Sequence, residues 1–208
     1  MARLFSIRPA LTLRGRRFRG LRGWAGKPTH PPLTDLPVAA YVFAAAFDVL
    51  SFVLGRGDTP SDTAYEAHIA ATYVLIAGAL ISFPTALTGF WDWWKGLDRD
   101  RSKGALGKAK HTQVWRTANW HMAVMLTVTL LTIVNIRMHL ANWDEGVTDV
   151  PILIVSVLAG ALVAFGALYG GALVYEYQFN VESLKGSTVW DETEQDQFPG
   201  KPSAPPAP

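Results

Sequence analysis

Four long apolar stretches divide this sequence, at residues 33–54, 68–90, 114–140 and 150–175. An α-helix rises about 1.5 Å per residue, so about 20 apolar residues are enough to cross the hydrocarbon core of a bilayer. Each stretch has that length. The sequence therefore predicts an all-α protein, a four-helix transmembrane bundle, and leaves little chain for a separate soluble domain.

The number of basic residues alternates between high and low in the segments that flank these stretches. Of the 19 Lys and Arg residues, eight precede the first span and one follows it; seven lie in and beside the next loop, one ends the third span, and two lie in the tail. Basic residues are retained on the cytoplasmic side of a bilayer. The alternation predicts that both termini lie inside, an N-in/C-in arrangement.

Three segments follow from this pattern. Residues 1–29 form a basic cytoplasmic arm, residues 30–177 the four-span membrane domain, and residues 178–208 a polar, Pro-rich cytoplasmic tail that we expect to be disordered. The arm suits anionic lipid headgroups, although retention of topology alone also explains it. Membrane tethering explains the arm more simply than nucleic acid does, so we expect no nucleic-acid partner.

The absence of cysteine narrows the chemistry of any bound cofactor. The chain has none, which excludes disulfides, iron–sulfur clusters bound by this chain, and thiolate or covalent attachment of haem. The sequence also lacks a Walker-type loop, a dinucleotide-binding Gly motif, a nucleophile elbow and an HExxH motif. We therefore expect no stand-alone catalytic activity.

Two histidines mark a candidate site on the basic side of the bundle. His30 opens the first span, and His121 lies at a similar depth in the third. Two imidazoles from two helices at one depth are the minimum for bis-imidazole ligation of haem b, or for two ligands of a metal ion. Asp92 is a candidate acceptor that orients one imidazole. A proton-relay role, or simple hydrogen bonding to the backbone or to each other, explains the same residues.

Polar residues also occur on the outer side. Asp48 lies within the first span and needs a partner in the bundle, and Arg137 ends the third span at a similar depth. We predict a structural Asp48–Arg137 ion pair, with a proton or ion path as the alternative role. His139 follows His121 by 18 residues, five helical turns, and so lies on the same face. His68 is the outer counterpart of His139, and the two could form a second, outer histidine pair. Both lie near loops, however, so we expect solvated surface residues.

Short motifs in all four spans resemble one family. They are His30-Pro31-Pro32-Leu33 with Pro37 and Asp48, Gly89-Phe90-Trp91-Asp92-Trp93, His121 with Arg137, and Gly170 to Tyr175. Over about residues 26–182 the chain resembles the four-helix bacterial membrane family DUF2231, although the Asn that usually follows the family's third-span His is missing here. Some relatives resemble fusions with Rieske-type iron–sulfur domains, which implies a redox-associated membrane subunit with His30 and His121 as the matched histidines.

Three functional hypotheses follow. The first is a membrane subunit of an electron-transfer system that binds haem b or a metal ion through His30 and His121. The second is a non-catalytic accessory subunit, because the small residues Gly160, Ala164, Ala167 and Gly171 and the charged termini offer contacts to other membrane subunits or to a second copy. The third is a small transporter.

Overall fold

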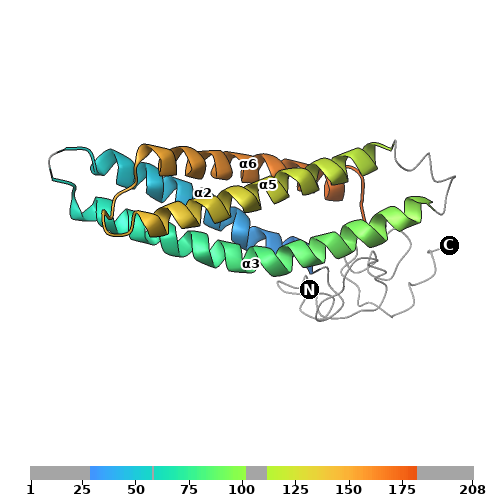
Figure 1. The fold of residues 1–208 in the computed structure, drawn as a ribbon. Coiled ribbons are helices and arrows are strands. Elements are labelled where there is room, and N and C mark those ends of the chain that lie inside the picture. Colours follow the sequence, from blue (N-terminus) through green and yellow to red (C-terminus); the bar gives the residue numbers. More distant parts are fainter. Residues whose placement is uncertain (1–28, 58, 102–111, 182–208) are drawn as a thin grey trace, which may run out of the picture.

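The computed structural model describes residues 29–57, 59–101 and 112–181, which form four antiparallel helices (Figure 1). In chain order these are α2 (His30–Leu54), α3 (Asp62–Arg101), α5 (Gln113–Ala141) and α6 (Val150–Tyr175). We call the end where α2 begins and α6 ends the inner end, and the end that carries the α2–α3 and α5–α6 connections the outer end. The predicted all-α bundle is confirmed. The basic arm up to residue 28, His111 and the tail from residue 182 lie outside the described residues.

Local signals set the helix starts. Pro31 and Pro32 occupy the first turn of α2, where a missing N–H leaves no hydrogen bond unmade. The Thr112 side chain accepts a hydrogen bond from the Trp115 N–H and caps α5, and Asp149 caps α6 in the same way. α2, α5 and α6 therefore each begin within about three residues of the apolar stretch that predicted them.

Two boundaries differ from the predicted ones. α3 begins at Asp62 and runs to Arg101, whereas the apolar stretch that predicted it covers only residues 68–90. The first residues of the expected tail are packed: Phe179 N–H donates to the Leu173 carbonyl at 2.8 Å, and the buried Asn180 donates to the Asp92 carbonyl at 3.1 Å. Short-range hydrogen bonds to the end of the bundle thus extend the ordered domain to at least residue 181.

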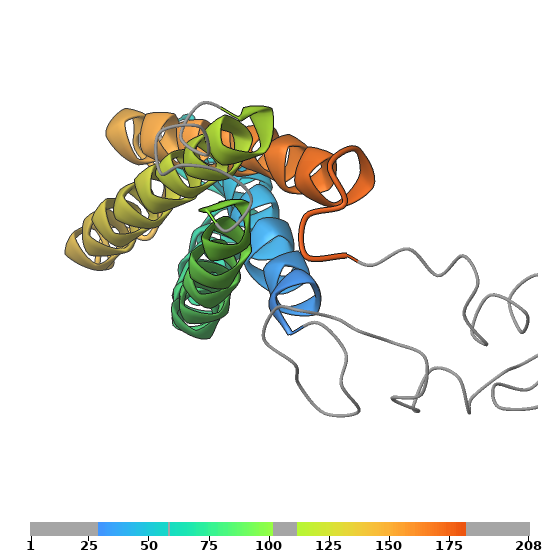
Figure 2. The same ribbon diagram turned by 90° about the vertical axis from the view of Figure 1, so that its right-hand side faces the viewer.

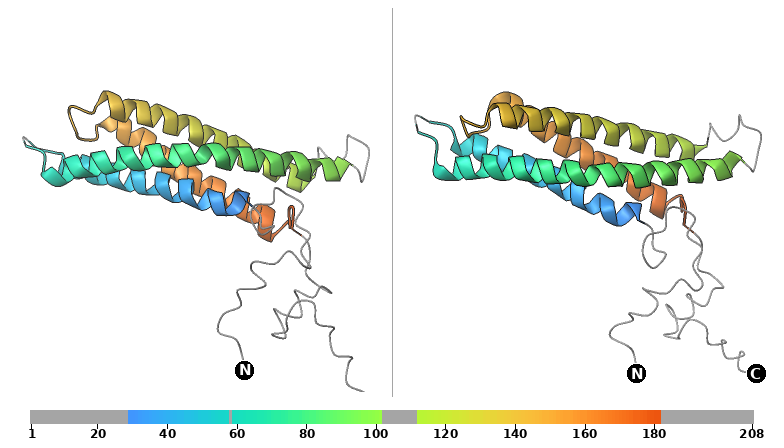
Figure 3. Two further views of the ribbon diagram at one scale, coloured as in Figure 1. Left: turned by 90° about the horizontal axis from the view of Figure 1, so that it is seen from below. Right: turned by 60° about the horizontal axis from the view of Figure 1, so that its bottom comes forward.

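The helices pack around a central pair, α2 and α6. α2 contacts both α3 and α6, and α5 packs mainly on α6 (Figures 2 and 3). Close approach depends on glycine: a Cβ added to Gly160 would lie 3.0 Å from the Cβ of Ala45 on α2, and one added to Gly166 would lie 3.0 Å from the sulfur of Met125 on α5. Small residues at such positions allow helices in membranes to approach closely.

The surface around the sides of the bundle is apolar. Leu80, Phe83 and Leu168 are each at least 70 % exposed, and each helix includes a segment of 25 residues or more that is apolar enough to cross a membrane. Contiguous apolar surface of this kind is rare on soluble monomers and is natural against lipid. The protein is a multi-pass membrane protein.

Candidate functional site

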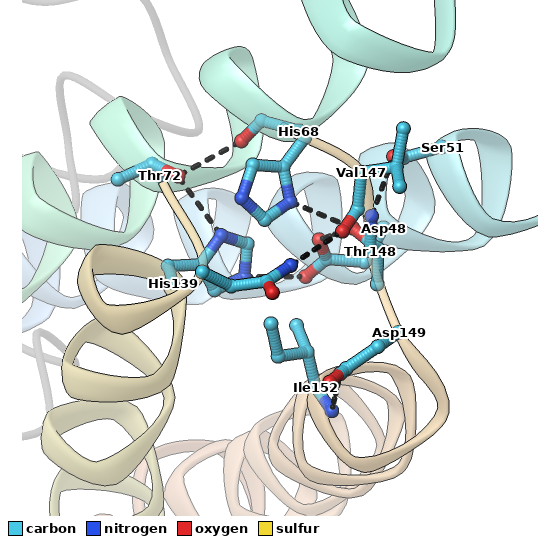
Figure 4. A network of polar contacts seen from close by, with 10 residues as sticks. Asp48, Ser51, His68, Thr72, His139, Val147, Thr148, Asp149 and Ile152 are labelled. Atoms are coloured by element: carbon cyan, nitrogen blue, oxygen red, sulfur yellow. Dashed lines mark hydrogen bonds and ion pairs between the residues drawn. The ribbon is translucent and has the colours of Figure 1, made fainter. Parts of the chain in front are cut away.

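Buried polar side chains join α2, α3, α5 and the α5–α6 loop at the outer end (Figure 4). We call this set the outer network: Asp48, Ser51, His68, Thr72, His139 and Thr148. All six are buried, and the side chains of Asp48, His68 and His139 are 0 % exposed. Polar groups without access to water must find partners within the protein.

Asp48 lies at the centre of the outer network. Its Oδ1 accepts a hydrogen bond from the Thr148 hydroxyl at 2.8 Å, and its Oδ2 lies 3.2 Å from His139 Nε2. His68 Nδ1 lies 3.0 Å from Thr148 Oγ1, and His139 Nδ1 lies 2.8 Å from Thr72 Oγ1. The two imidazole rings stack, with centroids 4.5 Å apart and planes 17° from parallel. Both histidines are thus linked to one carboxylate.

The number of available hydrogens determines the tautomers. The Thr148 hydroxyl donates its one hydrogen to Asp48, so His68 Nδ1 must donate to Thr148. The Thr72 hydroxyl donates to the His68 carbonyl at 2.9 Å, so His139 Nδ1 must donate to Thr72. An ionised carboxylate oxygen and a bare imidazole Nε2 are both acceptors, so the contact between Asp48 and His139 needs a proton. That proton is shared, and the pair is neutral overall wherever it resides.

The α5–α6 loop carries Thr148 into the outer network. Gly146 has a φ of +68°, a conformation that side chains with a Cβ rarely adopt, and this reverses the chain after α5. The Thr148 N–H then donates to Ser51 Oγ at 3.0 Å, which ties the loop to α2. One residue later, the Asp149 carboxylate accepts from the Ile152 N–H at 2.9 Å and starts α6.

Two predictions about the outer side are wrong. Arg137 is exposed and does not pair with Asp48, whose partners are His139 and Thr148. Arg137 and His139 are two residues apart, about 200° around the helix, so they point to nearly opposite sides of α5. His68 and His139 are completely buried, whereas the sequence suggested solvated surface residues.

The outer network also contains a possible metal-ligand set. Asp48, His68 and His139 each offer one ligand atom, and these atoms lie within 4.8 Å of one another. Two imidazoles and a carboxylate suit zinc or ferrous iron. However, the lone pairs of stacked rings lie in nearly parallel planes, so one ring would have to turn before both could bind the same ion. The arrangement therefore favours the hydrogen-bonded outer network over a metal-bound one.

A cavity of about 880 Å³ occupies the inner half of the bundle. We call it the inner cavity. All four helices line it, together with residues 179–181. Its walls are mainly apolar, with Val38, Phe90, Met125 and Leu173 among them. An apolar cavity with a few polar groups is the usual form of a site for an organic ligand.

Both predicted histidines line the inner cavity. His30 Nδ1 lies 3.0 Å from the Thr85 carbonyl oxygen, and His121 Nδ1 lies 2.9 Å from the Gly166 carbonyl oxygen. Because a carbonyl only accepts, each Nδ1 carries a hydrogen. A charged ring without an acidic partner would be costly in this apolar cavity, so each ring is neutral and Nε2 keeps its lone pair. Among the described residues, neither Nε2 has a hydrogen-bond partner. The two rings are therefore neutral imidazoles whose potential ligand atoms are free.

Glycines make room for the two rings. A Cβ added to Gly89 would lie 2.6 Å from His30 Cε1, closer than real Cβ contacts allow, and one added to Gly170 would lie 3.2 Å from His121 Cε1. Each imidazole therefore packs against the backbone of a neighbouring helix, His30 on α3 and His121 on α6. Backbone contact on one side and a carbonyl at Nδ1 together restrict each ring to one orientation.

Asp92 does not have the predicted orienting role. It is buried and lines the inner cavity, but the acceptors at the two Nδ1 atoms are the Thr85 and Gly166 carbonyls. Trp93 supplies a polar group that the sequence did not suggest. It lines the same cavity, and its buried indole N–H has no hydrogen-bond partner among the residues that the structure describes.

Sequence reasoning missed the hydroxyl groups that position the histidines. Thr72 follows His68 by one helical turn, so the shared face was a usable signal. Thr148 lies in a loop, where no periodicity predicts its neighbours. The backbone carbonyls of Thr85 and Gly166 carry no signal in the sequence, because every residue has one.

No curated protein and no solved structure matches the chain significantly. The sequence model of one family, described as predicted membrane protein (DUF2231), matches residues 26–183, which cover all four helices. The chain belongs to the DUF2231 family of predicted membrane proteins.

Proposed function

We propose that this protein is a membrane subunit of an electron-transfer system, located in a bacterial inner membrane, which binds haem b between His30 and His121. The observation that carries the proposal is the pair of neutral imidazoles in one apolar cavity, each with Nδ1 held by a backbone carbonyl. Metal-ligating histidines typically donate their second nitrogen in this way, which sets the tautomer and the ring orientation.

The shape and lining of the inner cavity favour a macrocycle over a bare ion. Organic ligand sites typically have volumes of about 300–1,000 Å³, and the inner cavity has about 880 Å³. Its apolar walls suit the faces of a porphyrin. The chain has no cysteine, so haem would be held without covalent attachment, by imidazole ligation.

Other groups on this chain fit the same ligand. The unpaired indole N–H of Trp93 is a donor at the inner cavity for an acidic group such as a propionate. Gly89 and Gly170 keep the imidazoles in place, and Phe179 and Val181 cover the wall near the inner end. If His30 and His121 both held haem, the group would supply one-electron transfer and not substrate activation.

The position of the inner cavity indicates the side from which electron-transfer partners would approach. It lies in the inner half of the bundle, whereas the outer half is closed by the outer network. A haem held at this depth by His30 and His121 would supply one-electron transfer to groups that approach from the inner side or from neighbouring subunits. We therefore propose other membrane subunits, or a second copy of this chain, as electron-transfer partners, with anionic lipids at the basic arm.

The test is the optical spectrum and iron content of the purified protein. We expect a Soret band and bands of low-spin bis-imidazole haem, which His121→Gly removes and added imidazole restores. Trp120→Phe is the matched control, because Trp120 is exposed and adjacent in sequence. Colourless wild-type protein without bound iron contradicts the proposal. If such protein co-purified with stoichiometric membrane partners, the accessory-subunit hypothesis would take its place.

A further inference from the structure

Between the outer network and the inner cavity, several buried polar side chains have no hydrogen-bond partner among the described residues. On α5, Thr132 Oγ1 and both polar atoms of the Asn135 amide lack hydrogen bonds among the described residues, and so does Ser156 Oγ on α6. Thr132 and Asn135 are 0 % exposed. Unpaired buried amides are rare, and polar groups in such positions are typically satisfied by buried water.

These side chains are aligned with the outer network. Thr132, Asn135 and His139 lie at spacings of three and four residues on one face of α5, and Thr132 and His139 are about 10 Å apart along the axis. Asn135 lies six residues before Ala141 and Ser156 six residues after Val150, so the two are at a similar depth from the outer end. Their polar groups thus continue inward from His139.

The inner end of this column reaches the inner cavity. The Tyr41 hydroxyl bonds Ser82 Oγ at 2.6 Å, and both residues line the cavity. Thr132 lies near the same hydroxyl, although the two groups do not meet hydrogen-bond geometry. The buried Ala44 and Ala159 lie on the same helix faces as Tyr41 and Ser156.

The outer end of the column begins at His68. Its Nδ1 donates through Thr148 to Asp48 Oδ1, while its buried Nε2 has no partner among the residues that the structure describes. An imidazole with a free lone pair on one nitrogen and a donated hydrogen on the other can accept a proton at the first and release one at the second.

From these contacts we infer that the protein conducts protons between its outer end and the inner cavity. A proton binds His68 Nε2, the Nδ1 proton of His68 passes to Thr148, and the Thr148 hydroxyl proton passes to Asp48. The proton held between Asp48 and His139 then moves inward through water at Asn135 and past Thr132 to the Tyr41 hydroxyl at the inner cavity. Turning of the Asp48 carboxyl group returns a proton to the side that faces His139, and turning of the His68 ring and the Thr148 hydroxyl restores the rest of the starting hydrogen-bond pattern. Only N–H and O–H bonds break and form, so no oxidant or reductant is needed.

The test uses the full chain in liposomes that contain a pH-sensitive dye, with a potassium diffusion potential as the driving force. We expect wild-type protein to acidify the liposomes faster than protein-free membranes do. Asn135→Leu should lower the rate by about tenfold or more, which corresponds to about 1.4 kcal/mol in the barrier. Thr127→Val is the control, because Thr127 is exposed to lipid on the same helix and bonds only the Ala123 carbonyl.

Folding of the variants is checked on the same samples. Asn135→Leu breaks no hydrogen bond among the residues that the structure describes, so we expect unchanged or higher thermal stability. Thr132→Val is a second, isosteric variant that should also slow the flux. Wild-type flux equal to that of protein-free liposomes, or Asn135→Leu flux equal to wild type, overturns the inference. The inference does not rest on haem, and the haem content of each sample separates the two proposals.

Discussion

His139 Nε2 and Asp48 Oδ2 lie 3.2 Å apart and share a proton in a part of the bundle where neither side chain is exposed. A lone carboxylate in a membrane span costs several kcal/mol, whereas a neutral hydrogen-bonded pair avoids most of that cost. This contact explains how an aspartate is accommodated within the first apolar span. It also links α2 to α5. Apart from this contact, each of these two helices packs mainly on α3 and α6.

Removal of Asp48 should destabilise the bundle. We expect Asp48→Ala to lower the free energy of unfolding by about 3–5 kcal/mol, because the change leaves buried partners unpaired. Arg137→Ala should change it by no more than about 0.5 kcal/mol, since Arg137 is exposed. Denaturant titration in detergent measures both values. Equal losses of stability in the two variants would contradict this result and support the Asp48–Arg137 ion pair that the sequence suggested.

Thr148 should tolerate serine but not valine. Thr148→Val keeps the shape of the side chain but removes the donor to Asp48 and the acceptor for His68. Each buried group left unpaired costs about 1–3 kcal/mol. Thr148→Ser keeps both hydrogen bonds and should remain near wild type in the same titration. Similar stability of the two variants would show that the hydroxyl does not bridge these residues.

The fold could be predicted because lipid imposes one strong condition on the sequence. Each span must be apolar over the thickness of the bilayer, so the four helices are visible as apolar stretches. The boundary error at α3 has a physical cause: a helix can continue beyond the bilayer into water, where hydropathy no longer marks it. The end of α3 at Arg101 was therefore not visible in the sequence.

The candidate site was partly predictable. Equal depth brought His30 and His121 to one cavity, because depth follows directly from position in a span. The partner of Asp48 was missed because depth alone ignores rotation about the helix axis. With His139 and Asn135 one turn apart on the buried face, Arg137 had to lie about 200° away from His139. Helix phase, applied with depth, would have identified the correct pair.

The predicted N-in orientation can be tested by thiol labelling, because the chain has no cysteine of its own. Asp144 and Gln113 are exposed at opposite ends of the bundle. In intact cells a membrane-impermeant thiol reagent should label Asp144→Cys readily, and Gln113→Cys only after permeabilisation. The reverse pattern would show that the bundle is inserted with its inner end outside.

Gly89 provides a steric test of the imidazole position. In Gly89→Ala the new Cβ would lie 2.6 Å from His30 Cε1, so the ring must move away from the Thr85 carbonyl that orients it. We expect lower haem content and a loss of about 1–3 kcal/mol in unfolding free energy from overpacking. Gly171→Ala is the matched control, because its Cβ would have no other side chain within 4 Å. There we expect unchanged haem content and stability equal to wild type or higher by about 0.5–1 kcal/mol, since alanine favours the helix. Equal haem content and stability in the two variants would mean that His30 does not depend on contact with α3 for its orientation.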